Sequence, residues 1–430
     1  MTHQESSANG NGKPNGSASA AANGKAANVE QLAVSPNLPF QVPALLDQIA
    51  SSGKEFVEDS QARLSLLEAA RSLVYALETP REAIIRHCWS ETTSYAAVET
   101  AVGLNLFTAL GTDDTPRSVA ELAETIGSEP ALLGRLMKHL AAMGVITETG
   151  RDEYRSTGFS KVLTVEKYSD AFPLMTSRFT RGILALPEFL QKTNYRNPTS
   201  ATNTAFQLGY DTKLGFFGHL QQEPVTAKQF NNHMGVYAQG RARWMDPGFY
   251  PVQEQLIDGI TIGKEDVLLV DVGGSFGHDL SDFRRKWPSV PGRLVLQDLP
   301  EVVSSVKDLH PSIEVTSHDF FTEQPIKGAR AYYMHSVLHD WPDDHCQKIL
   351  DNLVAAMKPG HSKLLVNENV IPDTGAYWET TSLDLIMMQI GSGERTERQW
   401  HALLASAGLK ITKIWTAQRG VESLIECELA

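Results

Sequence analysis

The stretch VLLVDVGGSFGHDL, residues 267–280, decides the fold of the larger part of this chain. An apolar run ends at Asp271, and the glycine-rich GGSFG follows almost at once. A buried strand that ends in a glycine turn is the pattern by which parallel sheets bring their backbone close to a nucleotide. Ser275 stands where a third evenly spaced glycine would complete G-x-G-x-G. Taken alone, the stretch fits either a cofactor loop or a strand that ends in a tight turn.

The chain beyond this stretch alternates between short apolar segments and helical patterns. Such alternation predicts an α/β fold with a parallel sheet, and it places any ligand at the carboxyl ends of the strands. The last two apolar segments lie close together, which predicts a hairpin that adds an antiparallel strand. Seven segments are candidate strands: VLLVDV, RLVLQD, IEVTS, RAYYMHSVL, KLLVNENV, LKITKIW and SLIECEL.

Length and charge narrow the class of protein. The 430 residues have room for two or three domains, and the formal net charge of -13 disfavours broad binding to nucleic acid or to an anionic membrane. The three cysteines are far apart in the sequence, which argues against a disulfide framework or a cysteine zinc site and fits a reducing, cytoplasmic compartment. No segment approaches the roughly 18 apolar residues of a membrane span.

The first half of the chain is predominantly helical by pattern. Residues 1–38 are predicted to be a disordered tail, because they begin with a run of Ala, Gly, Asn and Ser that lacks the apolar region of a signal peptide. Residues 39–175 are predicted to form a helical domain whose end, helix–turn–helix and then a short hairpin, is a winged-helix order. A winged helix binds DNA or serves as a dimerisation or lid module. The second helix has only Arg135, Lys138 and His139 as basic groups, which favours dimerisation or a lid.

Residues 176–430 are predicted to form a second domain, in which a helical lead-in precedes the parallel sheet. Three polar or aromatic groups follow successive predicted strands of this domain. Asp298 ends the second strand, where an acid can accept hydrogen bonds from both hydroxyls of a ribose. Asp319 and Phe320, in HDFF, end the third strand and offer an acceptor and a ring face to an adenine. Together with Asp271 and Gly273 they favour an adenosine site over a structural turn.

One histidine occupies a place where a general base would be useful. His339 falls just beyond an apolar strand, on a loop above the sheet. The alternative is a histidine that only caps a helix or packs against its neighbours, and for an isolated histidine that alternative is the commoner one.

Six motifs in order give this sequence a resemblance to a known family. DVGGSFGH, LQDLPEVV, HDFF, LHDWPDDHC, LLVNENVIPD and SGERTERQWHALLASAGL resemble those of the S-adenosylmethionine-dependent class I O-methyltransferases of plants and fungi, and the fungal polyketide branch is the most similar. The resemblance covers roughly residues 90–430. It implies a Rossmann-like catalytic domain, an N-terminal winged-helix-like dimerisation region, a homodimer and S-adenosyl-L-methionine as cofactor.

The resemblance also assigns roles to individual residues. His339 matches the general base, and the acids Glu368 and Glu394 match the residues that flank it. His335 stands where many plant members have a cofactor-binding lysine, so this contact is open. The positions that match cofactor contacts are Asp271, Gly273, Gly274, Asp298, Leu299, Asp319 and Phe320.

The expected chemistry is removal of a phenolic proton followed by methylation of the oxygen. A phenol has a pKa of about 10 and needs a base at neutral pH. We expect no metal ion, because no acidic trio accompanies the histidines near residue 339. Aromatic and methionine side chains are candidates for a flat, apolar acceptor pocket, with ordinary core packing as the alternative for each. These pocket candidates, together with the acid that follows the base, are Phe230, Met234, Trp244, Met245, Asp340, Met387 and Met388.

The sequence therefore predicts O-methylation of a phenolic, polyketide-like metabolite. A second hypothesis is a pericyclase or dehydratase of secondary metabolism that binds S-adenosylmethionine without moving its methyl group. Ser275 and His335 leave that alternative open, whereas the complete set of His339, Glu368 and Glu394 favours methyl transfer. A third hypothesis, a winged-helix regulator that senses the cofactor, conflicts with the negative charge of the chain.

Overall fold

The computed structural model describes residues 28–54, 56, 58, 60–237, 239–307 and 309–430. These residues divide into two compact units, one up to Thr93 and one from Ser94 to Ala430. Most of the predicted N-terminal tail lies outside the described residues. The boundary predicted at residues 175 and 176 falls within the second unit and stays a prediction. None of the described helices is long and apolar enough to cross a membrane.

The N-terminal unit consists of helices with an exposed apolar surface. Its α2 has no buried residue, and Phe40 just before it is three-quarters exposed. A capping box between Thr79 and Glu82 begins α4. The elements of this unit are α1 (Val29–Ala33), η1 (Pro39–Gln41), α2 (Val42–Lys54), α3 (Ser60–Leu77), α4 (Pro80–Ile85) and η2 (Arg86–Ser90).

The second unit begins with the predicted winged-helix order. Helix α7 starts at a capping box between Ser118 and Glu121, and α8 has Pro130 in its first turn. Strands β2 and β3 form the predicted hairpin, and the sheet order is β1-β3-β2. The elements are α5 (Glu91–Gly103), α6 (Leu106–Leu110), β1 (Arg117–Ser118), α7 (Val119–Ile126), α8 (Pro130–Ala142), β2 (Ile146–Gly150) and β3 (Glu153–Ser156).

A group of short helices connects the winged-helix region to the large sheet. Phe179, Phe206 and Phe216 form a small aromatic core among them, against which Phe230 of α15 packs. The helices are α9 (Gly158–Val162), α10 (Glu166–Ser169), α11 (Ala171–Arg178), α12 (Thr180–Lys192), α13 (Ala205–Tyr210), α14 (Phe216–Leu220) and α15 (Pro224–Tyr237), and η3 (Gln253–Ile257) follows.

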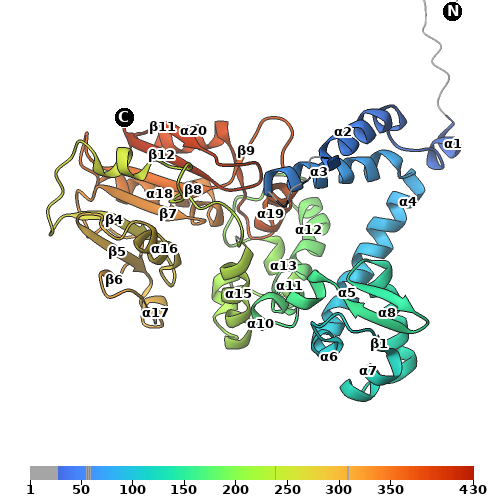
Figure 1. The fold of residues 1–430 in the computed structure, drawn as a ribbon. Coiled ribbons are helices and arrows are strands. Elements are labelled where there is room, and N and C mark those ends of the chain that lie inside the picture. The colour runs from blue at the N-terminus through green and yellow to red at the C-terminus, as the bar shows by residue number, and fades with distance from the viewer. Residues whose placement is uncertain (1–27, 55, 57, 59, 238, 308) are drawn as a thin grey trace, which may run out of the picture. The chain divides into compact units, whose positions relative to one another are not determined.

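The large sheet contains all seven predicted strands in the order β11-β12-β8-β7-β4-β5-β6 (Figure 1). The five strands from β4 to β8 are parallel, and β12 runs antiparallel to both β8 and β11, as the hairpin prediction required. The bounds are β4 (Val267–Val272), β5 (Arg293–Asp298), β6 (Ile313–Ser317), β7 (Ala331–His335), β8 (Lys363–Glu368), β11 (Leu409–Trp415) and β12 (Ser423–Leu429).

Helices cover both faces of this sheet. Alternate strand residues point to opposite sides, and because apolar residues point to both sides, each face packs against helices. Val270 of β4 points to the core under α18 and α20, whereas Leu269 points to the core under α16. The remaining elements are α16 (His278–Lys286), α17 (Pro300–Val303), η4 (Leu338–Asp340), α18 (Asp343–Val354), β9 (Val370–Ile371), α19 (Trp378–Met388), β10 (Arg395–Thr396) and α20 (Glu397–Ser406).

The strand order places a switch point between β4 and β7. From β4 the chain builds β5 and β6 on one side, and it then crosses to β7 on the other. In parallel sheets, ligands bind in the crevice outside the carboxyl ends of the strands at such a point. The loops after β4 and β7, which contain the predicted cofactor glycines and His339, meet here.

Candidate active site

His339 and Glu394 form the central contact of the site. His339 lies in η4, in the loop after β7, and its Nδ1 is 2.7 Å from Oε1 of Glu394. Both residues are buried. With Nδ1 committed to Glu394, Nε2 is the ring nitrogen that can exchange a proton with a substrate. Oδ1 of Asp340 lies 3.5 Å from Nε2.

Glu368, the last residue of β8, supports the same loop through its backbone. Its Oε1 accepts hydrogen bonds from the amides of Val337, Leu338 and His339, at 3.0, 2.9 and 3.3 Å. Its Oε2 is 3.9 Å from Nδ1 of the imidazole and accepts no hydrogen bond from a described residue. The two acids expected to flank the base therefore differ in their contacts: Glu394 bonds the ring, and Glu368 holds the loop.

The three acids around His339 set its proton affinity. Burial works against a charged imidazole, but the neighbouring carboxylates, led by that of Glu368, outweigh it and raise the pKa of His339 well above its usual value. Burial raises the pKa of Glu368 to about 7, although the nearby imidazole acts in the opposite direction. Burial also raises the pKa of Asp340 to about 6. The base is therefore free to accept a proton only at a higher pH than an ordinary histidine would be.

Three residues that the sequence analysis did not single out hold this arrangement. Arg395, next to Glu394, donates to the backbone carbonyls of Leu338 and Trp341 at 2.8 and 2.9 Å. Ser392 donates to the carbonyl of His339, and Asp384 of α19 accepts from the amide of Glu394 at 2.9 Å. The ERT motif pointed at Glu394, and the adjacent Arg395 was the one available signal for this support.

The glycine loop after β4 has the close packing that its sequence suggested. A side chain at Gly273 would lie 3.1 Å from Val337 and 3.6 Å from the ring of Phe320, and one at Gly274 would overlap the carboxylate of Asp271. Asp271 itself is buried beneath the loop, and neither of its carboxylate oxygens has a hydrogen-bond partner among the described residues. Burial raises the pKa of Asp271 well above its usual value.

Ser275 has a backbone conformation that is rare for a serine. Its φ is +53°, in the left-handed region where glycine is favoured. Its amide donates to Oδ2 of Asp298 at 2.8 Å, and this hydrogen bond from a neighbouring strand end holds the turn. The loop thus takes a glycine-like conformation in spite of the serine.

The adenosine candidates surround this loop. Oδ1 of Asp298 accepts from the amide of Leu299 at 2.7 Å, and the lone pairs that remain on the carboxylate can still accept from hydroxyl donors. Leu299 and Asp319 are exposed, and Phe320 is partly buried and packs edge-on against Phe321. An open glycine backbone, an acceptor and an aromatic ring in one place fit the ribose and adenine of S-adenosylmethionine.

His335 does not have the free donor that a direct cofactor contact would need. Its Nδ1 is 2.6 Å from Oδ2 of Asp279, and its Nε2 is 2.9 Å from Oε2 of Glu422. Both ring nitrogens are therefore engaged by carboxylates, and His335 does not take over the contact of the plant lysine by direct binding. Asp279 and Glu422 were not predicted, because they are 56 and 87 positions from His335.

The acceptor candidates separate into two groups. Phe230 and Met234 lie on α15, and Met387 and Met388 lie on α19, the helix that leads into the turn of Glu394. Trp244 and Met245 differ from these four, because both are buried in the core under α16, and their place in the acceptor pocket stays a prediction. That core includes Tyr333 and Phe283, whose rings have centroids 5.2 and 5.5 Å from that of Trp244.

The cluster around the base also has the composition of a metal site. Among the described residues, His339, Glu368 and Glu394 offer ligand atoms that all lie within 4.8 Å of one another. In this structure the imidazole and Glu394 are at hydrogen-bond distance, and Glu368 binds backbone amides. The expectation that no metal ion takes part stays a prediction.

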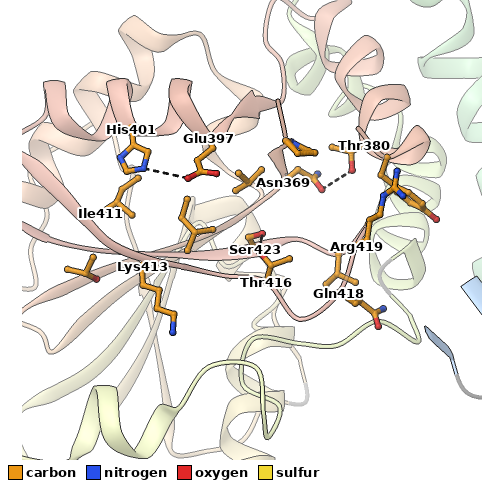
Figure 2. Close-up of a pocket in the computed structure, with 17 residues that line it drawn as sticks. Asn369, Thr380, Glu397, His401, Ile411, Lys413, Thr416, Gln418, Arg419 and Ser423 are labelled. Carbon is orange, nitrogen blue, oxygen red and sulfur yellow. Dashed lines mark hydrogen bonds and ion pairs between the residues drawn. The ribbon is translucent and has the colours of Figure 1, made fainter. Parts of the chain in front are cut away.

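A separate cavity of about 570 Å³ lies beside β11 and α20 (Figure 2). Asn369 and Thr380 line one part of it, and Glu397 and His401 of α20 line another. Its volume suits a small molecule, but none of the predicted site residues lines it. The loop between β11 and β12, which contains Arg419, forms one of its walls.

Two family models match the chain. An O-methyltransferase domain matches residues 260–410, and an O-methyltransferase dimerisation domain matches residues 91–166. The first range contains the glycine loop and the three residues of the base cluster. The second contains the winged-helix region, which agrees with the preference for dimerisation over DNA binding.

Individual proteins are similar to this chain over most of its length. O-methyltransferase mpaG of Penicillium brevicompactum is 38% identical over 392 residues, which cover 90% of this chain and 98% of that protein. The solved structure of LepI with S-adenosylmethionine has a TM-score of 0.81 at 30% identity and covers 91% of this chain and 99% of its own. A structure described as a pericyclic reaction enzyme has a TM-score of 0.80 at 30% identity, with 91% of this chain and 100% of its own covered.

The pericyclic neighbour shares the fold, whereas the family model describes an O-methyltransferase domain and the relative that covers 90% of this chain is named an O-methyltransferase. Methyl transfer is therefore the better supported activity. The chain belongs to the class I O-methyltransferases of the plant and fungal type, and it is an enzyme whose cofactor is S-adenosyl-L-methionine.

Proposed function

We propose that this enzyme methylates a phenolic hydroxyl of an aromatic, polyketide-like small molecule, with His339 as the general base. The observation that supports this most is the 2.7 Å contact between Nδ1 of His339 and Glu394, which leaves Nε2 for the acceptor. The aromatic and methionine side chains on α15 and α19 suit a flat acceptor, and the resemblance to the fungal polyketide branch suggests its class.

The residues of the base cluster act on one proton. A phenol with a pKa of about 10 is a weak nucleophile at neutral pH, so its proton passes to Nε2 as the oxygen reacts. Glu394 stabilises the imidazolium through Nδ1 and fixes the orientation of the ring. The proton then leaves Nε2 for solvent, and the base is restored.

The supporting residues keep the base in place without touching the acceptor. Glu368 binds three successive amides of the base loop, and Arg395 binds two carbonyls of the same loop. Glu368 thus fixes backbone amides of the base loop and Arg395 fixes backbone carbonyls, so charged side chains hold both kinds of backbone group. Such support restricts the imidazole to one position relative to the acceptor.

The cofactor, when bound, supplies a methyl group that is already activated as a sulfonium. We propose that Gly273 and Gly274 let the backbone approach it, that Asp298 accepts from its ribose, and that Phe320 packs against its adenine. Leu299 and Asp319 are proposed as further contacts of the cofactor. Asp271, which lies beneath the glycine loop, belongs to the same cofactor site. What remains for the protein is positioning, with oxygen and methyl carbon about 3 Å apart.

The acceptor side is proposed to consist of Phe230 and Met234 of α15, Met387 and Met388 of α19, and Asp340 beside the base. Met234 is 40% exposed, whereas Met387 is buried, so the two helices offer apolar side chains at different depths. Methionine adapts its shape to a ring more readily than branched residues do.

We also propose a homodimer formed through a domain at residues 39–175, a catalytic domain at 176–430 and a cytoplasmic location. The match of residues 91–166 to a dimerisation domain supports the dimer. The three cysteines are free, which suits a reducing compartment. Light scattering on the purified chain tests the dimer, for which a single species of twice the 47.2 kDa chain mass is expected.

The test of the reaction uses S-adenosylmethionine labelled in its methyl group and a panel of phenolic polyketides. We expect label in a product whose added mass is that of one methyl group. Conversion of a substrate without uptake of label would contradict the proposed methylation and support the pericyclic alternative.

A further inference from the structure

A second histidine–carboxylate cluster lies beside the base cluster and has no part in the proton transfer. Its centre is His335, at the carboxyl end of β7, and its flanking acids are Asp279 and Glu422. Asp279 belongs to the first turn of α16, and Glu422 directly precedes β12. The side chains of all three are at least four-fifths buried.

The geometry requires a charged imidazole. A neutral imidazole donates from one nitrogen and accepts at the other, whereas both nitrogens of His335 face carboxylate oxygens at 2.6 and 2.9 Å. Only an imidazolium donates in both directions. Two buried carboxylates are therefore joined through one positive charge.

The other groups around the cluster satisfy the remaining acceptors. Oδ2 of Asp279 accepts from the hydroxyl of Tyr333 at 2.7 Å, and Oδ1 pairs with Arg243 at 3.0 Å. Oε1 of Glu422 accepts from Tyr237 and Ser336 at 2.5 and 3.0 Å, and Oε2 receives a longer hydrogen bond from Asn367 at 3.4 Å. The positive charges of His335 and Arg243 thus balance the negative charges of the two acids.

The effect on proton affinity agrees with this geometry. Burial acts against the charge of His335, but the two carboxylates outweigh it and raise its pKa well above its usual value. Burial alone would raise the pKa of Glu422, yet the imidazolium lowers it to about 2. The cluster therefore keeps its charges throughout the physiological range of pH.

The cluster joins three parts of the site. Gly277, the end of the glycine loop, directly precedes α16, so Asp279 in the first turn of this helix fixes the position of that loop. Ser336 follows His335, has a φ of +50° and begins the turn into the base loop. Tyr237 is the last residue of α15, which carries Phe230 and Met234 of the proposed acceptor side.

We propose that His335 is a positioning residue, a permanently charged link that holds the glycine loop, the base loop and the end of α15 in one arrangement through Asp279 and Glu422. It binds neither cofactor nor acceptor itself. The inference rests on the assignment of the glycine loop to the cofactor, which is part of the proposed function.

The proposal is tested by substituting His335 and measuring the dissociation constant of S-adenosylhomocysteine by calorimetry. His335→Gln has a similar reach but is neutral and donates from one side only, so we expect binding at least about tenfold weaker. His335→Lys restores a charge that can donate to both acids, and we expect binding within about threefold of wild type. His401→Gln, on the exposed side of α20, is the matched control and should bind as wild type does.

A double variant separates lost charge from general damage. In His335→Gln combined with Glu422→Gln, one charge of each sign is removed, so no acid is left unpaired by the change. We expect this variant to bind more tightly and to melt at a higher temperature than His335→Gln alone.

Nuclear magnetic resonance of the wild type provides a reading that does not depend on any variant. With nitrogen-15 in the 13 histidines, one ring, identified by its absence from His335→Lys, should keep both nitrogens protonated from pH 6 to pH 8.5. A ring that loses a proton within that range would overturn the proposal.

Two binding results would also overturn it. Wild-type affinity in His335→Gln would show that the link is not needed, and equal damage from Lys and Gln would show that charge is not what matters. Failure of the wild type itself to bind S-adenosylhomocysteine would overturn the cofactor assignment together with this inference.

Discussion

Nδ1 of His339 lies 2.7 Å from Oε1 of Glu394, and this contact determines which nitrogen of the base is available for chemistry. Glu368, the other acid of the cluster, contacts backbone amides instead. His339, Glu394 and Glu368 therefore have different roles in the site, and the effect of each on activity or stability can be measured separately.

Replacement of His339 by alanine should remove transfer but not cofactor binding. General base catalysis contributes about 10²- to 10⁴-fold, so we expect kcat to fall by at least about 10² in His339→Ala. The dissociation constant of S-adenosylhomocysteine should stay within about threefold of wild type. Label transfer at the wild-type rate in this variant would rule out His339 as the base.

Glu394→Gln and Glu368→Gln should have different consequences. The first removes the carboxylate that bonds the ring, so we expect kcat to fall at least about tenfold with little change in melting temperature. The second replaces an anion that accepts from three amides, so we expect the free energy of unfolding to fall by about 1–3 kcal/mol. Kinetics and thermal denaturation of both variants check this, and identical behaviour of the pair would contradict the division of roles.

The dependence of the rate on pH follows from the raised pKa of His339. The base accepts a proton only when neutral, so kcat/KM should rise with pH and level off well above pH 6.5. Glu394→Gln removes one of the carboxylates that raise this pKa, and its rising limb should move to lower pH. A limb that moves to higher pH, or a rate that falls between pH 6.5 and 8, would disagree with this assignment.

Ser275 offers a test of the loop conformation. At a φ of +53° a non-glycine residue costs about 1–2 kcal/mol, so Ser275→Gly should retain stability within about 1 kcal/mol and bind the cofactor as before. The amide that donates to Asp298 is kept. Ser275→Val, which is branched at Cβ, should lower the free energy of unfolding and weaken cofactor binding. Equal stability of the two variants would indicate that the loop adopts a different turn.

Removal of metal ions should leave the activity unchanged. We expect dialysis against EDTA to have no effect on label transfer, because the proton acceptor and its partner carboxylate are protein groups. Activity that is lost on dialysis and returns with Zn²⁺ or Fe²⁺ would assign His339, Glu368 and Glu394 to a metal site.

The sequence predicted the sheet well, because each strand contains its own signal. Short apolar segments separated by helical patterns identified all seven strands, and the closeness of the last two predicted the antiparallel pair. The motifs also named the residues of the base cluster. Pattern and resemblance sufficed wherever the relevant residues were close in sequence or stood in a recognisable motif.

Other features depend on partners that are distant in the sequence. The state of His335 is set by Asp279 and Glu422, and the turn at Ser275 is set by a carboxylate from another strand end. The side chain of Trp244 was suited to a pocket by composition, but composition does not say which side of the sheet an aromatic residue covers. Spatial neighbours determine each of these outcomes.

The order of the strands has a consequence for the synthesis of the protein. β12 is the last of the seven strands in chain order, yet it lies inside the sheet between β8 and β11, and Glu422 immediately precedes it. During translation, the other six strands of the sheet leave the ribosome before β12 does. Until β12 follows, β8 remains an open edge of the sheet, and Glu422, the acid that pairs with His335, is missing. The nascent chain should acquire its affinity for the cofactor only after β12 has been synthesised.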